Sequence, residues 1–233
     1  MADRAGFSCY VSDESKKYGI NERVRARCQA TMRYVPRVIR DKAWDVHYRL
    51  GGSSGLGSAG VSRSWKWSVI DRFVSKVDDV VDLGCGDLSF WEGRECLRYV
   101  GIDSSSYVIK KDRLKRPTWS FVVSRGERLL PVSGKVVFCL DVLFHVLDDD
   151  DCGQIIDNLC AYSTEWIFVY TWYKNRLGSK KSDHLYQVFR LLDKQHFSRR
   201  GFDCIAEVPS PTEVNPYGAM FVFNRRGKDR ASE

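Results

Sequence analysis

Apolar positions along the chain gather in short runs between turn signals, and each run has the length of a β-strand. Buried strands are predicted at VVDLG (80–84), RYVGID (98–103), WSFVVS (119–124), KVVFCLD (135–141) and EWIFVYTW (165–172). Two last runs, FDCIAEV (202–208) and AMFVFNR (219–225), flank a proline-bearing loop. They predict an antiparallel, hairpin-like end to the sheet.

Between the strands, apolar residues recur at the spacing of a helix face. Helices are predicted around residues 64–77, over 148–162, where acidic residues open the helix and favour its N-terminal dipole, and over 183–197. The apolar stripes of the first and third are Trp65, Val69, Phe73 and Val77, and Leu185, Val188, Phe189 and Leu192. Strands that alternate with helices predict a doubly wound α/β sheet, whose ligands bind beyond the carboxyl ends of the strands.

The first 60 residues do not follow this alternation. Residues 1–50 are polar and helical in pattern, and we expect Trp44, Val46 and Tyr48 to pack on later parts of the chain. The stretch GGSSGLGSAG (51–60) cannot sustain a helix or strand, so it predicts a mobile loop or lid, with a passive linker as the alternative. We therefore divide the chain into a helical N-terminal arm with this loop (1–60), an α/β domain (61–226) and a basic tail (227–233).

Composition narrows the class of protein. The chain has 233 residues, of which 43% are hydrophobic and 29% charged, as in ordinary globular proteins. Its longest apolar runs are far shorter than the roughly 20 residues that span a bilayer, and its first residues lack the apolar core of a signal peptide. We expect an intracellular, cytoplasmic protein. The eight cysteines form no metal-ligand spacing, so no metal site is predicted.

The charge is basic and clustered. Lys and Arg outnumber Asp and Glu by 37 − 30 = 7, and the excess gathers in residues 23–42, 110–116 and 225–230. Such clusters suit a polyanion such as RNA, because contacts to phosphates release counterions. A solvated basic surface is the alternative interpretation.

A glycine turn follows the first strand. In VVDLGCGDLSF, Gly84 and Gly86 bracket Cys85, and Asp87 is expected to start a helix. The dinucleotide pattern GxGxxG is incomplete, because Ser89 stands at its third glycine. The turn alone therefore does not identify its ligand.

Two aspartates beside this turn indicate a ligand. Asp82 lies two residues before Gly84, where a carboxylate would repel a pyrophosphate but can accept from an ammonium. Asp103 ends the second strand, where a carboxylate can accept from both hydroxyls of a ribose. Together they suit an adenosine that carries a cationic amino acid, which describes S-adenosylmethionine.

DLGCG, then GID, then CLDVLFHVLDD (139–149) resemble class I (Rossmann-like) S-adenosylmethionine-dependent methyltransferases, over roughly residues 60–225. The resemblance implies a seven-stranded sheet in the order 3-2-1-4-5-7-6 with strand 7 antiparallel, and S-adenosylmethionine as cofactor. It implies that Asp82 and the turn from Gly84 to Gly86, Cys85 included, lie under the methionine portion, and Asp103 on the ribose.

The third strand departs from the family pattern. Many members place an acidic residue at its end for the adenine amino group, but here Ser124, Arg125 and Gly126 follow. Ser124 or Glu127 could substitute. Ser104, Ser124 and Asp141 complete our set of cofactor-binding candidates.

The catalytic candidates lie near the predicted carboxyl edge. His145, four residues after Asp141, is a candidate base, since a histidine pKa is ordinarily about 6.5, with a structural histidine as the alternative. The order of Lys66, Asp141, Lys174 and Glu207 is similar to the Lys, Asp, Lys, Glu tetrad of RNA ribose 2′-O-methyltransferases. In that family the second lysine deprotonates or orients a ribose hydroxyl. Alternatively, Lys66 binds the cofactor carboxylate and Glu207 is a rim residue.

We therefore predict an S-adenosylmethionine-dependent methyltransferase with RNA as the acceptor, because aromatic residues that could stack bases lie among the basic clusters. A small-molecule O- or N-methyltransferase is the alternative. From another class, the chain could be a non-catalytic interaction module that keeps the cofactor fold. A nicotinamide-dependent oxidoreductase is opposed by Asp82 and by the missing third glycine.

Overall fold

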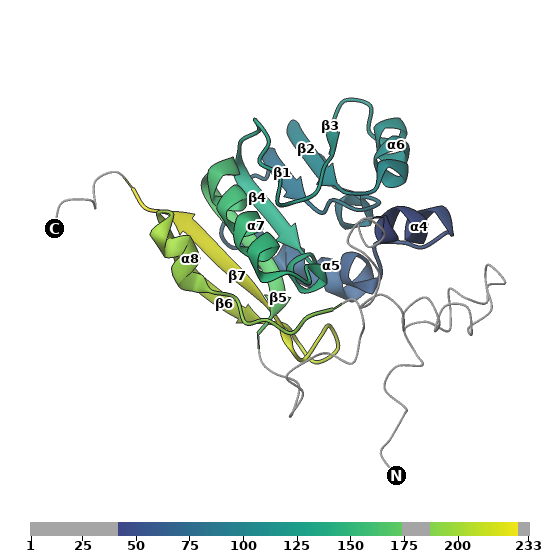
Figure 1. Ribbon diagram of the computed structural model, residues 1–233. Helices are drawn as coiled ribbons and strands as arrows, with labels where there is room; N and C mark the ends of the chain where they lie inside the picture. Colours follow the sequence, from purple (N-terminus) through teal and green to yellow (C-terminus); the bar gives the residue numbers. More distant parts are fainter. Residues whose placement is uncertain (1–41, 174–186, 228–233) are drawn as a thin grey trace, which may run out of the picture.

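The computed structural model describes residues 42–173 and 187–227 (Figure 1). Seven strands form one sheet in the order β3-β2-β1-β4-β5-β7-β6. They are β1 (Asp79–Leu83), β2 (Arg98–Asp103), β3 (Ser120–Val123), β4 (Gly134–Leu140), β5 (Ser163–Trp172), β6 (Phe202–Pro209) and β7 (Gly218–Arg225). The strands β1 to β5 pair in parallel, while β7 is antiparallel to β5 and β6. The predicted fold class, strand order and antiparallel seventh strand are confirmed.

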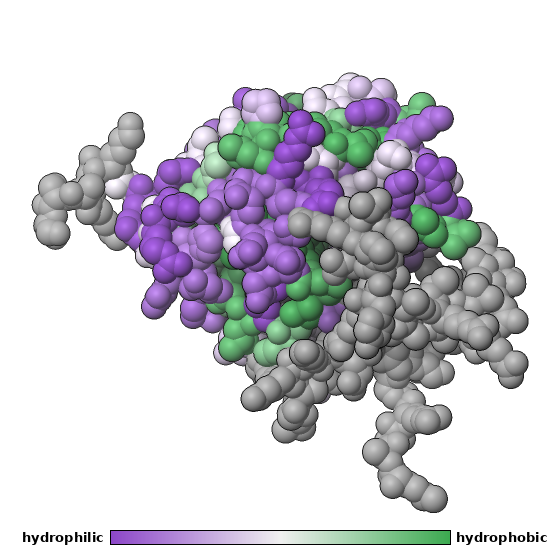
Figure 2. Space-filling model, viewed as in Figure 1, coloured by the Kyte–Doolittle hydropathy of each residue, from purple (hydrophilic) through white to green (hydrophobic). Residues whose placement is uncertain are grey.

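Helices cover both faces of the sheet. The α-helices are α4 (Ala43–Arg49), α5 (Gly60–Ile70), α6 (Ser106–Lys115), α7 (Asp149–Tyr162) and α8 (Lys194–Arg199), and the short 3-10 helices are η2 (Leu56–Ser58), η3 (Ser89–Trp91) and η4 (Leu143–His145). In Figure 1, α7 and α8 lie in front of the sheet. Figure 2 shows that they turn mainly hydrophilic residues to solvent there. Their apolar residues form one core cluster, and α5, η3 and α6 form the other on the opposite face.

The second of these clusters fixes α5 on the sheet. The Trp67 ring stacks on Phe90 with 4.7 Å between centroids, and its indole Nε1 donates to the Phe90 carbonyl at 2.9 Å. Lys66 precedes Trp67 in the same helix, so its side chain is carried to the end of β4, where it meets Asp141. Packing of one aromatic residue therefore positions a neighbouring charged one.

Helix α4 docks on the start of α6. The Asp45 carboxylate accepts from the Tyr107 backbone amide at 2.8 Å and from the hydroxyls of Ser105 and Ser106, both at 3.1 Å. These bonds satisfy polar groups at a helix N-terminus, where negative charge is also favoured. With Arg49, which donates to the same carboxylate, they hold the pKa of Asp45 well below its ordinary value. The described end of the predicted N-terminal arm is thus bound to the α/β sheet region.

Three expectations about helices are wrong in detail. No α-helix follows the glycine turn, because Leu88 takes the left-handed conformation (φ 64°) and residues 89–91 form only η3. The helix predicted around 64–77 spans Gly60–Ile70, so Phe73 lies beyond its end. Val46, expected to pack inward, is half exposed.

The helix predicted over 183–197 is also wrong for the residues that the structure describes. Residues 187–193 have no regular structure, and the Val188 amide donates to the Phe144 carbonyl at 2.7 Å instead of to a carbonyl of its own turn. Helix α8 begins only at Lys194, where the Asp193 side chain caps it by accepting from the Gln195 amide at 3.0 Å. Leu185 and residues 1–41 lie outside the described residues.

Candidate cofactor and acceptor site

The glycine turn at the end of β1 is tightly enclosed. Gly84 and Gly86 have φ of 80° and 57°, which only glycine adopts readily. The amides of Gly84 and Cys85 both donate to the Ile102 carbonyl, at 2.7 and 3.2 Å. A Cβ on Gly84 would lie 2.3 Å from the Val142 side chain, so the turn abuts the segment after β4. Burial raises the pKa of the Cys85 thiol well above its ordinary value, so this thiol stays protonated.

Asp103 joins the end of β2 to this turn. One carboxylate oxygen accepts from the Gly86 amide at 3.1 Å, and the other accepts from the Ser105 amide at 2.8 Å. Burial is the main cause that raises the pKa of this carboxyl to about 6, against the lowering effect of those amides. Each oxygen of an ionised carboxylate has a second acceptor position, so Asp103 retains capacity for two hydroxyl donors.

Asp82 supports the turn from within the core. Its Oδ2 accepts from the Trp91 indole at 2.8 Å and from the Tyr99 hydroxyl at 2.9 Å. Burial raises the pKa of this carboxyl to about 6, although both bonds lower it. At least one oxygen is thus used by buried aromatic residues. The predicted contact of Asp82 with the methionine ammonium stays a prediction.

A cavity of about 360 Å³ opens at the carboxyl ends of β2 and β3. It is lined by Ser104, Val123, Ser124, Arg125, Glu127 and Arg128. The Ser124 amide donates to the Asp103 carbonyl at 2.9 Å, and its hydroxyl donates to the Arg125 carbonyl at 3.2 Å. Arg125 forms an ion pair with Glu127. The predicted residues Ser104 and Ser124 therefore lie beside Asp103, at the place that the resemblance gives to the nucleobase.

Lys66 and Asp141 form a pair at the ends of β4 and β5. The Lys66 side chain is 1% exposed and that of Asp141 22%. The Lys66 ammonium also donates to the Gly57 carbonyl at 2.8 Å and lies 4.2 Å from the Tyr170 ring centroid. Asp141 itself has φ of 62°, a left-handed conformation that aspartate tolerates better than most residues. Two of the four predicted tetrad members are thus brought together.

The other two tetrad members do not join them in the described structure. Glu207 forms an ion pair with Lys194 of α8. Its neighbours Ala206 and Val208 pack against the cluster that contains Trp67, so Glu207 points to the other face of the sheet. Lys174 lies outside the described residues. The resemblance to the ribose 2′-O tetrad therefore has no assembled tetrad to support it.

An aromatic wall lies beyond Asp141. The His145 ring in η4 contacts Trp44 of α4 edge to face, with 5.0 Å between centroids, and Phe144 at 4.7 Å. Phe144 in turn packs on Trp172 at 5.1 Å. The predicted base His145 therefore stands in an aromatic surface, next to the Lys66–Asp141 pair in the chain fold.

Sequence reasoning missed Ser54 and the role of Asp87. Ser54 belongs to the segment read as a mobile loop, and Asp87 was read as a helix start, yet the two bond each other across 33 positions in the chain. No local periodicity signals such a contact. The nearest signal was the aspartate directly after two turn glycines.

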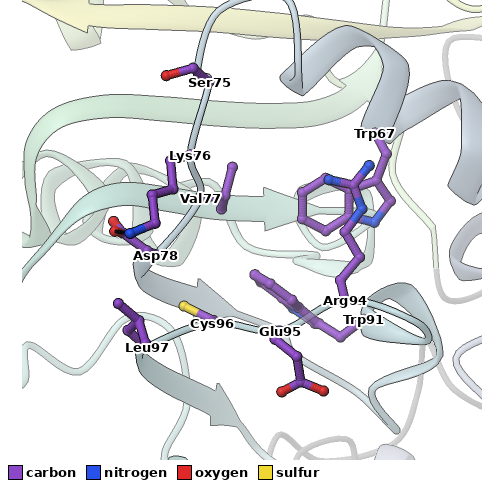
Figure 3. Close-up of a pocket in the computed structure, with 10 residues that line it drawn as sticks. All are labelled: Trp67, Ser75, Lys76, Val77, Asp78, Trp91, Arg94, Glu95, Cys96 and Leu97. Atoms are coloured by element: carbon purple, nitrogen blue, oxygen red, sulfur yellow. Dashed lines mark ion pairs between the residues drawn. The ribbon is translucent and has the colours of Figure 1, made fainter.

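A second cavity, of about 470 Å³, lies at the amino ends of β1 and β2 (Figure 3). Its charged side chains are paired: Lys76 with Asp78, and Arg94 with Asp71, while Arg94 also lies 4.0 Å from the Trp67 ring centroid. Ligands of doubly wound sheets bind at the opposite, carboxyl ends. We assign this cavity no part in the candidate site.

Other site types were searched in residues 42–173 and 187–227. No group of three or more His, Cys, Asp or Glu side chains there could hold a metal ion. None of the helices in that part of the chain has the length and apolar character needed to cross a membrane.

Asp112 in α6 is a buried carboxylate whose oxygens have no hydrogen-bond partner among the described residues, although Lys115 lies 3.5 Å away. Burial raises its pKa to about 7. An unfolded aspartate titrates near 3.9, so between pH 4 and 7 the folded state holds a proton that the unfolded state has lost. Stability contributed through this group therefore falls as pH rises across that window.

We expect Asp112→Asn, which cannot ionise, to remove this slope. Urea unfolding at pH 5 and pH 8 should show that the wild type loses at least about 2 kcal/mol more stability than the variant, from a shift worth about 1.4 kcal/mol per pKa unit. Equal losses in both proteins would contradict an ionisable, buried Asp112.

Comparisons with known proteins agree with the fold. No protein-family model matches the sequence, and no curated protein matches it. Among solved structures, magnesium protoporphyrin IX methyltransferase (ChlM) from Synechocystis with bound SAH is 15% identical, with a TM-score of 0.59 over 82% of this chain and 100% of that one. The N-methyltransferase NodS from Bradyrhizobium japonicum, in complex with S-adenosyl-L-homocysteine, is 12% identical, with a TM-score of 0.55 over 74% and 91%.

The [4+2]-cyclase SpnF is as similar in structure, with a TM-score of 0.59, 12% identity, and coverage of 83% of this chain and 96% of that one. At such identities the likeness concerns the fold. The chain has the fold of class I S-adenosylmethionine-dependent methyltransferases. Because a cyclase shares it, the fold does not by itself decide the reaction.

Proposed function

We propose that this protein is an S-adenosylmethionine-dependent methyltransferase. The observation that carries the proposal is the junction of Asp103 with the glycine turn, beside the cavity lined by Ser104 and Ser124. A carboxylate with free acceptor capacity next to a cavity at the ends of β2 and β3 suits an adenosine. ChlM and NodS, which share the fold, were crystallised with the product form of this cofactor.

The turn suits this cofactor better than a dinucleotide. A pyrophosphate needs backbone amides and a helix N-terminus that point at it. Here the amides of residues 84 to 87 all donate within the protein: two to Ile102, one to Asp103 and one to Ser54. The turn leads into η3 and not into an α-helix. The nicotinamide-dependent alternative thus loses both features that it requires.

The bound cofactor would supply a methyl group on a positively charged sulfur. We propose that residues 82, 84 to 86, 103, 104, 124 and 141 hold it, as the resemblance implies. The chain's own task is then to align the acceptor and to take its proton. His145 is the proposed base, since it stands in the aromatic wall close to the end of β4, and the Lys66–Asp141 pair fixes the backbone beside it.

RNA remains the proposed acceptor on the basic residues of the N-terminal arm. The second basic cluster gives it less support, because Arg116 pairs with Glu95, Arg113 donates to the Phe121 carbonyl, and Lys115 donates to the Asp87 carbonyl. A small-molecule acceptor with an oxygen or nitrogen nucleophile is the second candidate. The wall of Trp44, His145 and Phe144 favours it, since aromatic surfaces bind small apolar or planar groups.

The test of the main proposal is a calorimetric titration of the purified protein with S-adenosylhomocysteine, with NAD as the control. We expect binding of the first and none of the second. The reverse result would replace the proposal by the oxidoreductase alternative. Cofactor binding without transfer to any RNA or small-molecule acceptor would favour the non-catalytic interaction module.

A separate titration tests the RNA acceptor. We expect RNA binding that weakens with salt, and a double variant Arg25→Ala with Arg27→Ala that lowers the salt slope by about 2, since each lost phosphate contact removes about one unit. A double variant Lys110→Ala with Lys111→Ala serves as the control, because those lysines belong to the second cluster. No RNA binding at low salt would leave the small-molecule acceptor as the better candidate.

A further inference from the structure

The segment from Gly51 to Gly60, called the strap from here on, is fixed to the rest of the protein at several points. The His47 ring nitrogen Nε2 lies 2.8 Å from the Ser53 carbonyl oxygen. The Lys66 ammonium donates to the Gly57 carbonyl at 2.8 Å. The predicted mobile loop is therefore held at both its beginning and its end.

The centre of the strap is bound by a reciprocal pair. The Ser54 amide donates to the Asp87 carboxylate at 3.0 Å, and the Asp87 amide donates to the Ser54 hydroxyl oxygen at 2.8 Å. The Tyr48 hydroxyl lies 3.1 Å from the same Ser54 oxygen. Asp87 also accepts from the Ser89 amide, and these bonds outweigh burial and lower its pKa. The anchor of the strap is thus an ionised carboxylate directly after the glycine turn.

Glycines permit this close contact. A Cβ on Gly86 would lie 2.1 Å from the Ser54 hydroxyl oxygen and 3.0 Å from the Tyr48 oxygen. A Cβ on Gly57 would lie 2.7 Å from an Asp141 carboxylate oxygen. The strap therefore rests on both parts of the candidate site, the glycine turn and the Lys66–Asp141 pair. The cavity at Ser104 and Ser124 is lined by none of its residues.

We propose that Ser54 and Asp87 are positioning residues for the methyl donor, which hold the strap closed as the outer wall of the donor site at Gly86. The inference rests on the proposed function and extends it. The strap covers the turn and leaves the adenosine cavity open, so it is placed to contact the amino-acid end of a donor bound there. Donor binding and order in the strap are then thermodynamically coupled, each favouring the other.

Hydrogen exchange and calorimetry together test this coupling. In the wild type, S-adenosylhomocysteine should slow exchange of the amides in residues 51–60. Ser54→Ala removes the acceptor for the Asp87 amide, and Asp87→Asn places an amide nitrogen where an acceptor is needed. Each should speed strap exchange and weaken S-adenosylhomocysteine binding about three- to tenfold, as expected for one or two lost hydrogen bonds. Ser58→Ala, in the same strap, should change neither quantity.

The outcomes separate the two proposals. Wild-type protein that fails to bind S-adenosylhomocysteine removes the proposed function, and this inference with it. Binding that leaves strap exchange unchanged, or that Ser54→Ala and Asp87→Asn leave equal or make tighter, overturns the positioning role alone. Tighter binding would mean that the strap competes with the donor. A loss of folding in Asp87→Asn would show in the thermal unfolding curve, and Ser54→Ala then decides.

Discussion

Asp103→Ala is expected to raise the dissociation constant for S-adenosylhomocysteine at least about 30-fold. The carboxylate is proposed to accept from two ribose hydroxyls, and hydrogen bonds to a charged group contribute about 1.5 to 3 kcal/mol each, where 1.4 kcal/mol is tenfold. The variant also loses the bond from Asp103 to the Gly86 amide, so the turn itself is less ordered. Calorimetric titration of both proteins measures the change.

Asp79→Ala is the matched control for this prediction. Asp79 begins β1, at the amino end of the sheet, and its carboxylate pairs with Arg98 and not with the glycine turn. It should bind S-adenosylhomocysteine as the wild type does. Equal affinity of wild type and Asp103→Ala, with both folded by circular dichroism, would refute the assignment of Asp103 to the ribose.

Lys66→Met is expected to lower the free energy of unfolding by about 3 kcal/mol. Removing one partner of a buried ion pair leaves the other charge uncompensated, at a cost of about 3 to 5 kcal/mol. The lower end applies because Asp141 keeps 22% exposure while Lys66 has 1%. Methionine retains most of the volume, so the loss reports on charge and on the freed Gly57 carbonyl. Urea unfolding at neutral pH measures it.

Two further variants check the cause. Lys76→Met removes an exposed lysine that pairs with Asp78, and such a pair contributes about 0 to 1 kcal/mol. In the double variant Lys66→Met with Asp141→Asn, the stranded charge is gone, so part of the lost stability should return. A cost under 1 kcal/mol for Lys66→Met, or no recovery in the double variant, would contradict a stabilising buried pair.

Runs of apolar residues were sufficient to locate the strands. Each predicted strand agrees with the observed one within about two residues, since a central parallel strand is buried on both faces and needs a continuous apolar run. The glycine turn and Asp103 were also readable, because the left-handed conformation requires glycine and because both positions follow strand ends. The element after the turn was not readable, since Leu88 adopts a conformation that its side chain does not announce.

By itself, the sequence determined those features that depend on neighbours in the chain: the strands, helix α7 with its acidic start, and the turn at Gly84 and Gly86. Tertiary structure alone decided which distant groups meet. The strap bonds Asp87 across 33 residues, and Asp82 turns into a core that Trp91 and Tyr99 complete. A register shift between Cys204 and Ala206 sets the face of Glu207. A one-residue shift moves every later side chain to the other face, and no local pattern reveals it.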